Sequence, residues 1–459
     1  MYFEHKRRLL AGILLSAALL SGCTSKPPAP EGSGSAGADV SAPVGSGSAS
    51  VPTPPDGGSS ASGRGTADGS QDLEASGSGE AAAYDFSQPA PEREAVDNSY
   101  FEDAAFVGDS RTDGFMIYSG IGCGENLTSN GLSIFKLEEK KALTIDGQKY
   151  TLLEALALKQ YGKVYLSLGV NELGYYDDQG FYDAYCKAID DIRACQPNAV
   201  IYIQGLIPLN EDVIAQSGGP SYLTNEHLLV YNDLMRKAAE EKQVVFLDLN
   251  PEFTGADGKL PADASKDGVH LRKAYCEKWL DYLKTHTVDY ETLISGTGGS
   301  SVKMMKLFGL AAAAVCLLAL AGCGGQSGGE AGYTKEQVQT ILDSGAFTDE
   351  LDELDCDTAW ALYQLEEAGL SREDLTDGVI YRSAGATCEE LSLLIFSDSG
   401  AAQTAQGALE AYLQSQIENN RDYRPGEIPK LEDAVLRQEG STVLLAVSAD
   451  TPAVEALLG

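Results

Sequence analysis

Short apolar runs alternate with amphipathic stretches along residues 99 to 288. Four of these runs predict buried strands, at Ala104–Val107, Val164–Leu168, Val200–Gln204 and Val244–Leu249. Between them, Asp183–Ala194 and Leu228–Glu241 have the apolar spacing of amphipathic helices. Alternating strands and helices predict a parallel sheet with helices on both faces. Ligands bind such sheets at the carboxyl ends of the strands.

The last part of the chain, residues 324–459, has a different pattern. Its apolar spacing predicts helices at Lys335–Leu342, Asp357–Ala368 and Gln403–Asn419, and strands at Glu390–Phe396 and Thr442–Val447. It contains no histidine and is more acidic per residue than the rest. We therefore expect a second, smaller α+β domain. Its acidic run from Asp349 to Asp357 lacks the spacing of a calcium loop and predicts a solvated face.

The first 23 residues have the pattern of an export leader. A basic segment precedes the apolar run Leu9–Leu20, which is too short for a typical membrane span. The run ends in Leu20-Ser21-Gly22-Cys23, which resembles a bacterial lipobox and implies lipidation of Cys23. An ordinary signal peptide is the alternative. Residues 24–95 are rich in Gly, Ser and Pro and predict a disordered tether.

A second leader-like segment, residues 304–323, follows a linker at 291–303. It ends in Leu320-Ala321-Gly322-Cys323, so Cys323 is a second predicted lipidation site. An internal membrane helix is the alternative, but it would leave Lys303 and Lys306 outside the cell, against the positive-inside rule. We interpret the chain as two lipoproteins joined end to end, by gene fusion or by an error in gene delimitation. This predicts two independent domains without an extensive interface, anchored at the extracytoplasmic face of a bacterial membrane.

Residues suited to acyl transfer follow three of the predicted strands. They lie in Gly108-Asp109-Ser110, Gly169-Val170-Asn171-Glu172 and Asp267-Gly268-Val269-His270. A serine hydroxyl becomes a good nucleophile when a base takes its proton, and histidine suits this task near neutral pH. An aspartate can orient the imidazole, and an amide side chain can donate to the developing oxyanion.

Together these motifs resemble the four blocks of the SGNH/GDSL hydrolase superfamily over residues 99–288, which implies a three-layer α/β/α fold for a domain at 96–290. The resemblance implies that Ser110 is the nucleophile and the first oxyanion donor. It implies that Asn171 is a further donor, that Asp267 orients the base, and that His270 is the base. Gly131 is the best match to the glycine block and thus a further implied oxyanion donor, with Gly120, Gly122 and Gly124 as alternatives. Glu172 departs from the usual Gly-x-Asn-Asp pattern.

The C-terminal domain offers a second resemblance. Glu389-Glu390-Leu391, a long predicted helix and then Tyr423-Arg424-Pro425 are similar to a family of small lipoproteins of unknown function. Genes of that family tend to accompany membrane-bound O-acyltransferases, which implies a binding or accessory role.

The net charge of −35 argues against a nucleic-acid partner, since phosphate binding needs clustered Lys and Arg. The SGNH/GDSL resemblance, together with the predicted location, implies an esterase that removes small acyl groups, most simply acetyl, from a glycan. The alternatives are acyl transfer beside a membrane-bound O-acyltransferase and a non-catalytic binding lipoprotein.

No Cys/His cluster has metal-ligand spacing, so we expect neither metal nor cofactor. We expect free thiols at Cys123, Cys186, Cys195 and Cys276, and Cys356 with Cys388 is a possible disulfide.

Overall fold

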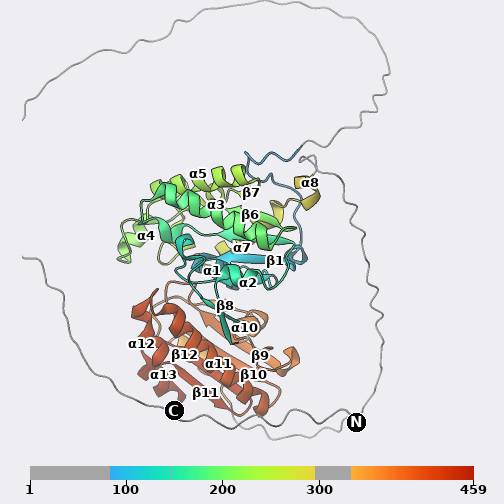
Figure 1. Ribbon diagram of the computed structural model, residues 1–459. Helices are drawn as coiled ribbons and strands as arrows, with labels where there is room; N and C mark the ends of the chain where they lie inside the picture. Colours follow the sequence, from blue (N-terminus) through green and yellow to red (C-terminus); the bar gives the residue numbers. More distant parts are fainter. Residues whose placement is uncertain (1–82, 146, 295–331) are drawn as a thin grey trace, which may run out of the picture. The chain divides into compact units, whose positions relative to one another are not determined.

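The computed structural model describes residues 83–145, 147–294 and 332–459 (Figure 1). Both predicted leaders, with Cys23 and Cys323, lie outside these residues, as do the predicted tether up to residue 82 and the predicted linker from residue 295. Within the described ranges, no helix has the length and apolar character needed to cross a membrane.

A five-stranded parallel sheet organises the first domain, in the order β2-β1-β5-β6-β7. Its strands are β1 (Ala104–Gly108), β2 (Glu125–Thr128), β5 (Lys163–Ser167), β6 (Val200–Gln204) and β7 (Val245–Leu247). Strand β1 pairs with β2 and β5, so that Gly108, Thr128 and Ser167 lie level at the carboxyl edge. Figure 1 shows helices on both sides of this sheet. The predicted α/β/α fold is confirmed.

The two faces of the sheet bury different side chains. On one face, Phe106, Tyr165 and Tyr202 from adjacent strands stack with ring centroids 4.8 and 4.5 Å apart. Helices α1 (Ser110–Tyr118) and α7 (Lys273–Thr285) contribute to this cluster. The other face packs aliphatic residues against α3 (Asp178–Cys195) and α5 (Asn225–Lys242). Shorter elements of the domain are β3 (Leu143–Ile145), β4 (Gln148–Tyr150), α2 (Leu152–Leu156), α4 (Glu211–Gln216), α6 (Asn250–Phe253) and α8 (Tyr290–Ile294).

The first domain begins earlier than the sequence predicts. Residues 83–95, assigned above to the tether, lie against the domain through backbone hydrogen bonds. The Ala90 N–H donates to the Phe246 carbonyl at 2.9 Å, and the Arg93 N–H donates to the Thr285 carbonyl at 2.7 Å. These bonds involve backbone atoms, which explains why residue composition did not reveal them.

The second domain has an antiparallel sheet in the order β11-β12-β10-β9-β8. Its strands are β8 (Asp352–Leu354), β9 (Leu375–Arg382), β10 (Glu390–Phe396), β11 (Val435–Glu439) and β12 (Thr442–Val447). The long helix α11 (Ser399–Asn420) packs on one face, while α9 (Lys335–Leu342) and α13 (Thr451–Leu458) pack on the other. Helices α10 (Cys356–Leu362) and α12 (Ile428–Glu432) complete it. The predicted smaller α+β domain is confirmed.

The prediction of two domains without an extensive interface is wrong for the described residues. The Tyr118 hydroxyl of α1 donates to the Ser383 carbonyl at 2.5 Å, and Arg272 forms an ion pair with Glu350 at 2.6 Å. One buried apolar cluster includes side chains of both domains. The acidic run is therefore not only a solvated face, because part of it meets basic residues of the first domain. Cys356 and Cys388 are both free thiols.

Trp279 anchors α7, the helix that follows His270, to the sheet. Its ring is 2% exposed, and its Nε1–H donates to Gln204 Oε1 at 2.9 Å. We predict that Trp279→Ala lowers the free energy of unfolding by about 3–5 kcal/mol, because it leaves a cavity and an unpaired amide. Urea denaturation measures the change. Leu158→Ala is the control, since Leu158 is 56% exposed; equal losses in the two variants would contradict this account of the core.

Candidate active site

The turn between β1 and α1 positions Ser110. Asp109 caps the helix, because its side chain accepts the Arg111 N–H at 2.9 Å. Gly108 is required before the cap, since a Cβ there would lie 2.8 Å from the Ser167 carbonyl oxygen and 2.1 Å from Thr112 Oγ1. Ser110 is the first residue of α1, so its N–H has no acceptor within the helix. Its side chain and its amide are thus both placed at the carboxyl edge of the sheet.

His270 lies beside Ser110, brought there by the loop before α7. His270 Nε2 is 2.9 Å from Ser110 Oγ, and Nδ1 is 2.6 Å from Asp267 Oδ2. The other oxygen of Asp267 accepts the N–H groups of Val269 and His270, each at 2.9 Å. The structure therefore brings the three residues together in the order that nucleophilic catalysis needs.

The electrostatics of Asp267 suit an orienting role. Burial by itself raises its pKa, but the His270 charge and the hydrogen bonds from His270 and Val269 outweigh burial and hold the pKa well below its usual range. Asp267 is therefore ionised at neutral pH and accepts the Nδ1 proton. This leaves Nε2 as an acceptor for the Ser110 proton.

The predicted oxyanion residues lie around the same turn. Asn171 Nδ2 donates to Asp109 Oδ2 at 3.1 Å and to the Leu132 carbonyl at 3.0 Å. The Asn171 amide is therefore held by protein acceptors and must release one of them to donate to an oxyanion. Gly131 has φ +66°, in the left-handed region that glycine tolerates, and no hydrogen bond of the described residues uses its N–H. Both residues are placed in the loops that border Ser110.

Two buried charged residues that the sequence analysis gave no role support the turn. Asp109 is 2% exposed, and burial raises its pKa to about 6 against the opposing effect of the Arg111 N–H and guanidinium. Arg111 is 6% exposed and donates to the Ile207 carbonyl at 2.9 Å. The guanidinium therefore ties the start of α1 to the segment after β6. Their adjacency to Ser110 was visible in the sequence, but their burial was not.

Glu172, the departure from the usual motif, is fully buried. Its Oε1 accepts the N–H of Ile134, while Oε2 has no hydrogen-bond partner among the described residues. Burial raises the pKa of Glu172 to about 8, so the carboxyl is largely protonated at neutral pH. Glu172 therefore holds the loop that carries Gly131 without placing a full negative charge beside the site.

Tyr423 of the second domain also reaches this site, and the sequence analysis did not assign it there. Its hydroxyl is 2.9 Å from Ser110 Oγ and 2.9 Å from His270 Nε2. Burial raises the pKa of Tyr423, which keeps the phenol neutral near pH 7. The only sequence signal was its place in the Tyr423-Arg424-Pro425 pattern, more than 300 residues after Ser110.

His227 has hydrogen-bond partners outside the Ser110–His270 pair. It pairs with Asp178 at 2.9 Å and contacts the Leu173 carbonyl. Its ring stacks on Tyr176. In the parts of the chain that the structure describes, no group of three or more His, Cys, Asp or Glu is arranged to hold a metal ion.

Comparison with known proteins gives two family matches. Residues 106–275 match the GDSL-like Lipase/Acylhydrolase family, and residues 357–448 match a domain of unknown function, DUF4358. No curated protein matches the chain significantly.

Several solved structures are similar to part of the chain. A GDSL-like lipase from Bacteroides thetaiotaomicron VPI-5482 is 12% identical, with a TM-score of 0.30, and the match covers 40% of this chain and 86% of that one. A peptidoglycan O-acetylesterase is 18% identical, with a TM-score of 0.28 and coverage of 35% and 45%. The lipopolysaccharide acetyltransferase periplasmic domain of Salmonella ser. Paratyphi A is 15% identical, with a TM-score of 0.30 and coverage of 40% and 82%.

The parallel sheet and the Ser–His–Asp arrangement at its carboxyl edge define a serine hydrolase of the α/β/α class. More specifically, the chain contains a GDSL/SGNH lipase-acylhydrolase domain, an SGNH-type serine hydrolase that acts on esters. A separate C-terminal domain belongs to the DUF4358 family.

The raised pKa of Glu172 makes stability depend on pH. Between pH 4.5, its ordinary pKa, and about 8, the folded protein holds a proton at Glu172 that the unfolded chain has released. The contribution of Glu172 to wild-type stability therefore falls as pH rises through this window. Glu172→Gln cannot titrate, so we predict that its melting temperature relative to wild type rises from about pH 5 to about pH 8.

Differential scanning fluorimetry across this pH range measures the difference. Glu226→Gln is the matched control for the exchange of Glu for Gln itself, because Glu226 is exposed. A melting-temperature difference between Glu172→Gln and wild type that does not vary with pH would contradict a titrating, buried Glu172.

Proposed function

We propose that this protein is an extracytoplasmic serine esterase that removes small acyl groups, most simply acetyl, from a glycan. The observation that carries the proposal is the contact of Ser110 Oγ with His270 Nε2 at 2.9 Å, with the ionised Asp267 on the opposite ring nitrogen. This arrangement activates a serine hydroxyl toward an ester carbonyl.

The reaction proceeds through an acyl-serine. His270 takes the Ser110 proton while Oγ bonds to the ester carbonyl carbon, and the carbonyl oxygen becomes an oxyanion. The N–H groups of Ser110 and Gly131 and the Asn171 amide are the proposed donors to this oxyanion. Collapse breaks the bond to the alcohol oxygen, which leaves with the proton from His270. A water molecule, deprotonated by His270, then attacks the acyl-Ser110. The acyl–Oγ bond breaks, Ser110 Oγ takes the proton from His270, and the acid is released.

A groove of mixed polar and apolar lining near the site supports a carbohydrate substrate. It has a volume of about 1010 Å³ and is lined by residues of both domains, including Ser129 and Asn130, which directly precede Gly131. Amide and hydroxyl side chains of the second domain, among them Gln416 and Asn419, line it as well. Uncharged groups that both donate and accept hydrogen bonds suit the hydroxyls of a sugar.

Location at the membrane is part of the proposal. It rests on the two lipobox-like motifs at Cys23 and Cys323, and it implies an acylated polymer of the cell envelope as substrate.

Acyl transfer to a sugar hydroxyl is a second candidate function, and one observation favours it. The Tyr423 hydroxyl lies within 2.9 Å of both Ser110 Oγ and His270 Nε2, so an alcohol oxygen fits where a deacylating water would otherwise stand. Such an enzyme would pass an acyl group from Ser110 to an acceptor glycan, beside a membrane-bound O-acyltransferase.

Ser110→Ala tests the nucleophile. We predict a loss of aryl acetate hydrolysis by about 10³-fold or more, because no acyl-enzyme can form. The melting temperature should stay close to that of wild type, since the substitution removes a single hydroxyl. Ser217→Ala, in an exposed turn, is the control and should keep full activity. A Ser110→Ala variant that retains most of the activity would overturn the assignment.

Product analysis distinguishes hydrolysis from transfer. With aryl acetate as donor, we predict that free acetate is the main product even when an acceptor glycan is added, as expected for an esterase. Mass spectrometry of the glycan detects acetyl transfer, the alternative outcome, directly. An acetylated glycan that forms in wild type and not in Ser110→Ala would establish transfer instead.

A further inference from the structure

The Tyr423 hydroxyl occupies a chemically defined position. Oγ of Ser110, Nε2 of His270 and the phenolic oxygen are mutually 2.9 Å apart. In ester cleavage by an acyl-serine mechanism, the alcohol oxygen must lie next to Oγ, where it is bonded to the carbonyl carbon. It must also lie next to Nε2, from which it takes a proton. The phenolic oxygen meets both conditions.

Tyr423 is firmly held in this position by its own domain. The Arg424 N–H donates to the Asn420 carbonyl at 2.8 Å, and Arg424 Nε donates to Asn420 Oδ1 at 3.1 Å. The Arg424 guanidinium also bonds to the Gly385 carbonyl. On the side of the first domain, the Tyr423 ring lies so close to Gly131 that a Cβ on Gly131 would be 2.5 Å from the ring. The ring therefore covers the glycine proposed to bind the oxyanion.

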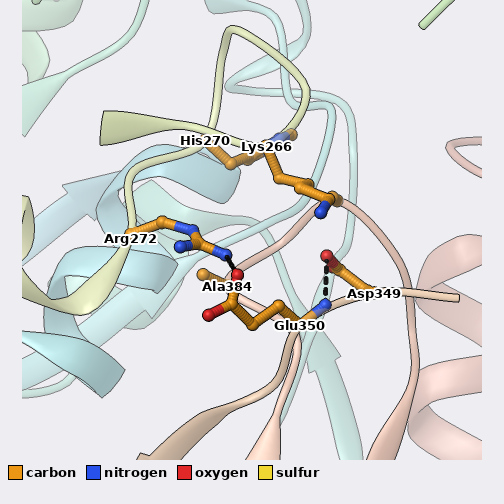
Figure 2. A pocket seen from close by; sticks show the side chains of 7 residues that line it. Lys266, His270, Arg272, Asp349, Glu350 and Ala384 are labelled. Atoms are coloured by element: carbon orange, nitrogen blue, oxygen red, sulfur yellow. Dashed lines mark hydrogen bonds and ion pairs between the residues drawn. The ribbon is translucent and has the colours of Figure 1, made fainter. Parts of the chain in front are cut away.

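The contact is part of a wider one between the two domains. Gly385 lies against the His270 ring, where a Cβ would be 3.0 Å from Cγ. Figure 2 shows the small pocket beside His270, in which Arg272 of the first domain reaches Glu350 of the second. Lys273 Nζ also donates to the Glu353 carbonyl at 2.9 Å. Basic residues after His270 thus meet the acidic run of the second domain.

The hydroxyl of Tyr423 competes with Ser110 for the base. When Nδ1–H donates to Asp267, Nε2 has a single lone pair to offer. Two hydroxyl groups lie within 2.9 Å of that lone pair. Whenever the phenol donates to Nε2, the Ser110 hydroxyl loses its acceptor and remains a poor nucleophile.

We propose that the C-terminal domain is a cap that regulates the catalytic serine, with the Tyr423 hydroxyl as an internal occupant of the alcohol-oxygen position. The capped enzyme is a resting state, and the alcohol portion of a substrate displaces Tyr423 to start the reaction. This assigns a function to the second domain. It rests on Ser110 and His270 as the catalytic pair and not on the identity of the glycan.

The rate at which a small fluorophosphonate labels Ser110 in the full chain tests the cap. This probe reports an activated serine whatever ester the enzyme cleaves. Tyr423→Phe removes the competing hydroxyl and keeps the ring, so labelling should be about three- to ten-fold faster than in wild type, the effect of one net hydrogen bond. Tyr381→Phe is the matched control, because the Tyr381 hydroxyl has no hydrogen bond in the described structure, and it should label at the wild-type rate.

Tyr118→Phe provides a second arm away from the site. It removes the two interdomain hydrogen bonds of the Tyr118 hydroxyl, to the Ser383 carbonyl and from Arg382, and should speed labelling in wild type but not in the Tyr423→Phe background. Unchanged or slower labelling of Tyr423→Phe would contradict the proposal that the second domain is a cap. An equal effect of Tyr118→Phe in wild type and in the Tyr423→Phe background would contradict it as well. Absence of Ser110 labelling in every variant would overturn the proposed esterase together with the cap. Melting temperatures confirm that each variant is folded.

Discussion

The parallel register of β1 between β2 and β5 is the constraint on which the site depends. It sets Gly108, Thr128 and Ser167 level at one edge, so the loops that follow them must converge. Ser110 follows β1, and Asn171 lies in the loop that follows β5. The aromatic stack across β1, β5 and β6 stabilises this register from one face of the sheet. The site is thus a consequence of strand pairing more than of any single side chain.

Buried ionisable groups are concentrated around the catalytic turn, and each is balanced in a different way. Asp267 stays ionised because His270 and two backbone N–H groups stabilise its charge. Asp109 and Glu172 are buried with less compensation, so their pKa values rise to about 6 and about 8. At neutral pH, Asp267 is therefore ionised and Asp109 largely so, while Glu172 holds its loop mainly as a neutral acid. Such arrangements are typical of active sites, where position and charge state matter more than stability.

The second domain changes how the catalytic one is understood. Alone, the Ser110–His270–Asp267 geometry describes a ready hydrolase. With Tyr423 at the alcohol-oxygen position, the same atoms describe an enzyme whose base has two competing donors. The ion pair of Arg272 and Glu350 lies close by, in a pocket that His270 also lines. Access to the serine and association of the domains are therefore physically linked.

The strand–helix alternation and the catalytic motifs could be predicted from the amino-acid sequence, because both are local. Apolar periodicity reports which face of an element is buried, and Ser110, Asn171 and His270 each follow an element with a clear pattern. The short edge strand β2 was missed, since its four residues are mostly polar and only partly buried. The start of the first domain was missed as well, because backbone bonds from Ala90 and Arg93 secure it.

The roles of Glu172 and Tyr423 depend on contacts between distant parts of the chain, which local patterns do not encode. The burial of Glu172, and with it the raised pKa, depends on Ile134 and its neighbours from another loop. Tyr423 meets Ser110 across more than 300 residues, in a contact between two domains that no periodicity encodes. Local patterns reveal secondary structure and motifs. The charge state of a buried group and the partner of a hydroxyl group depend on which surfaces meet in space.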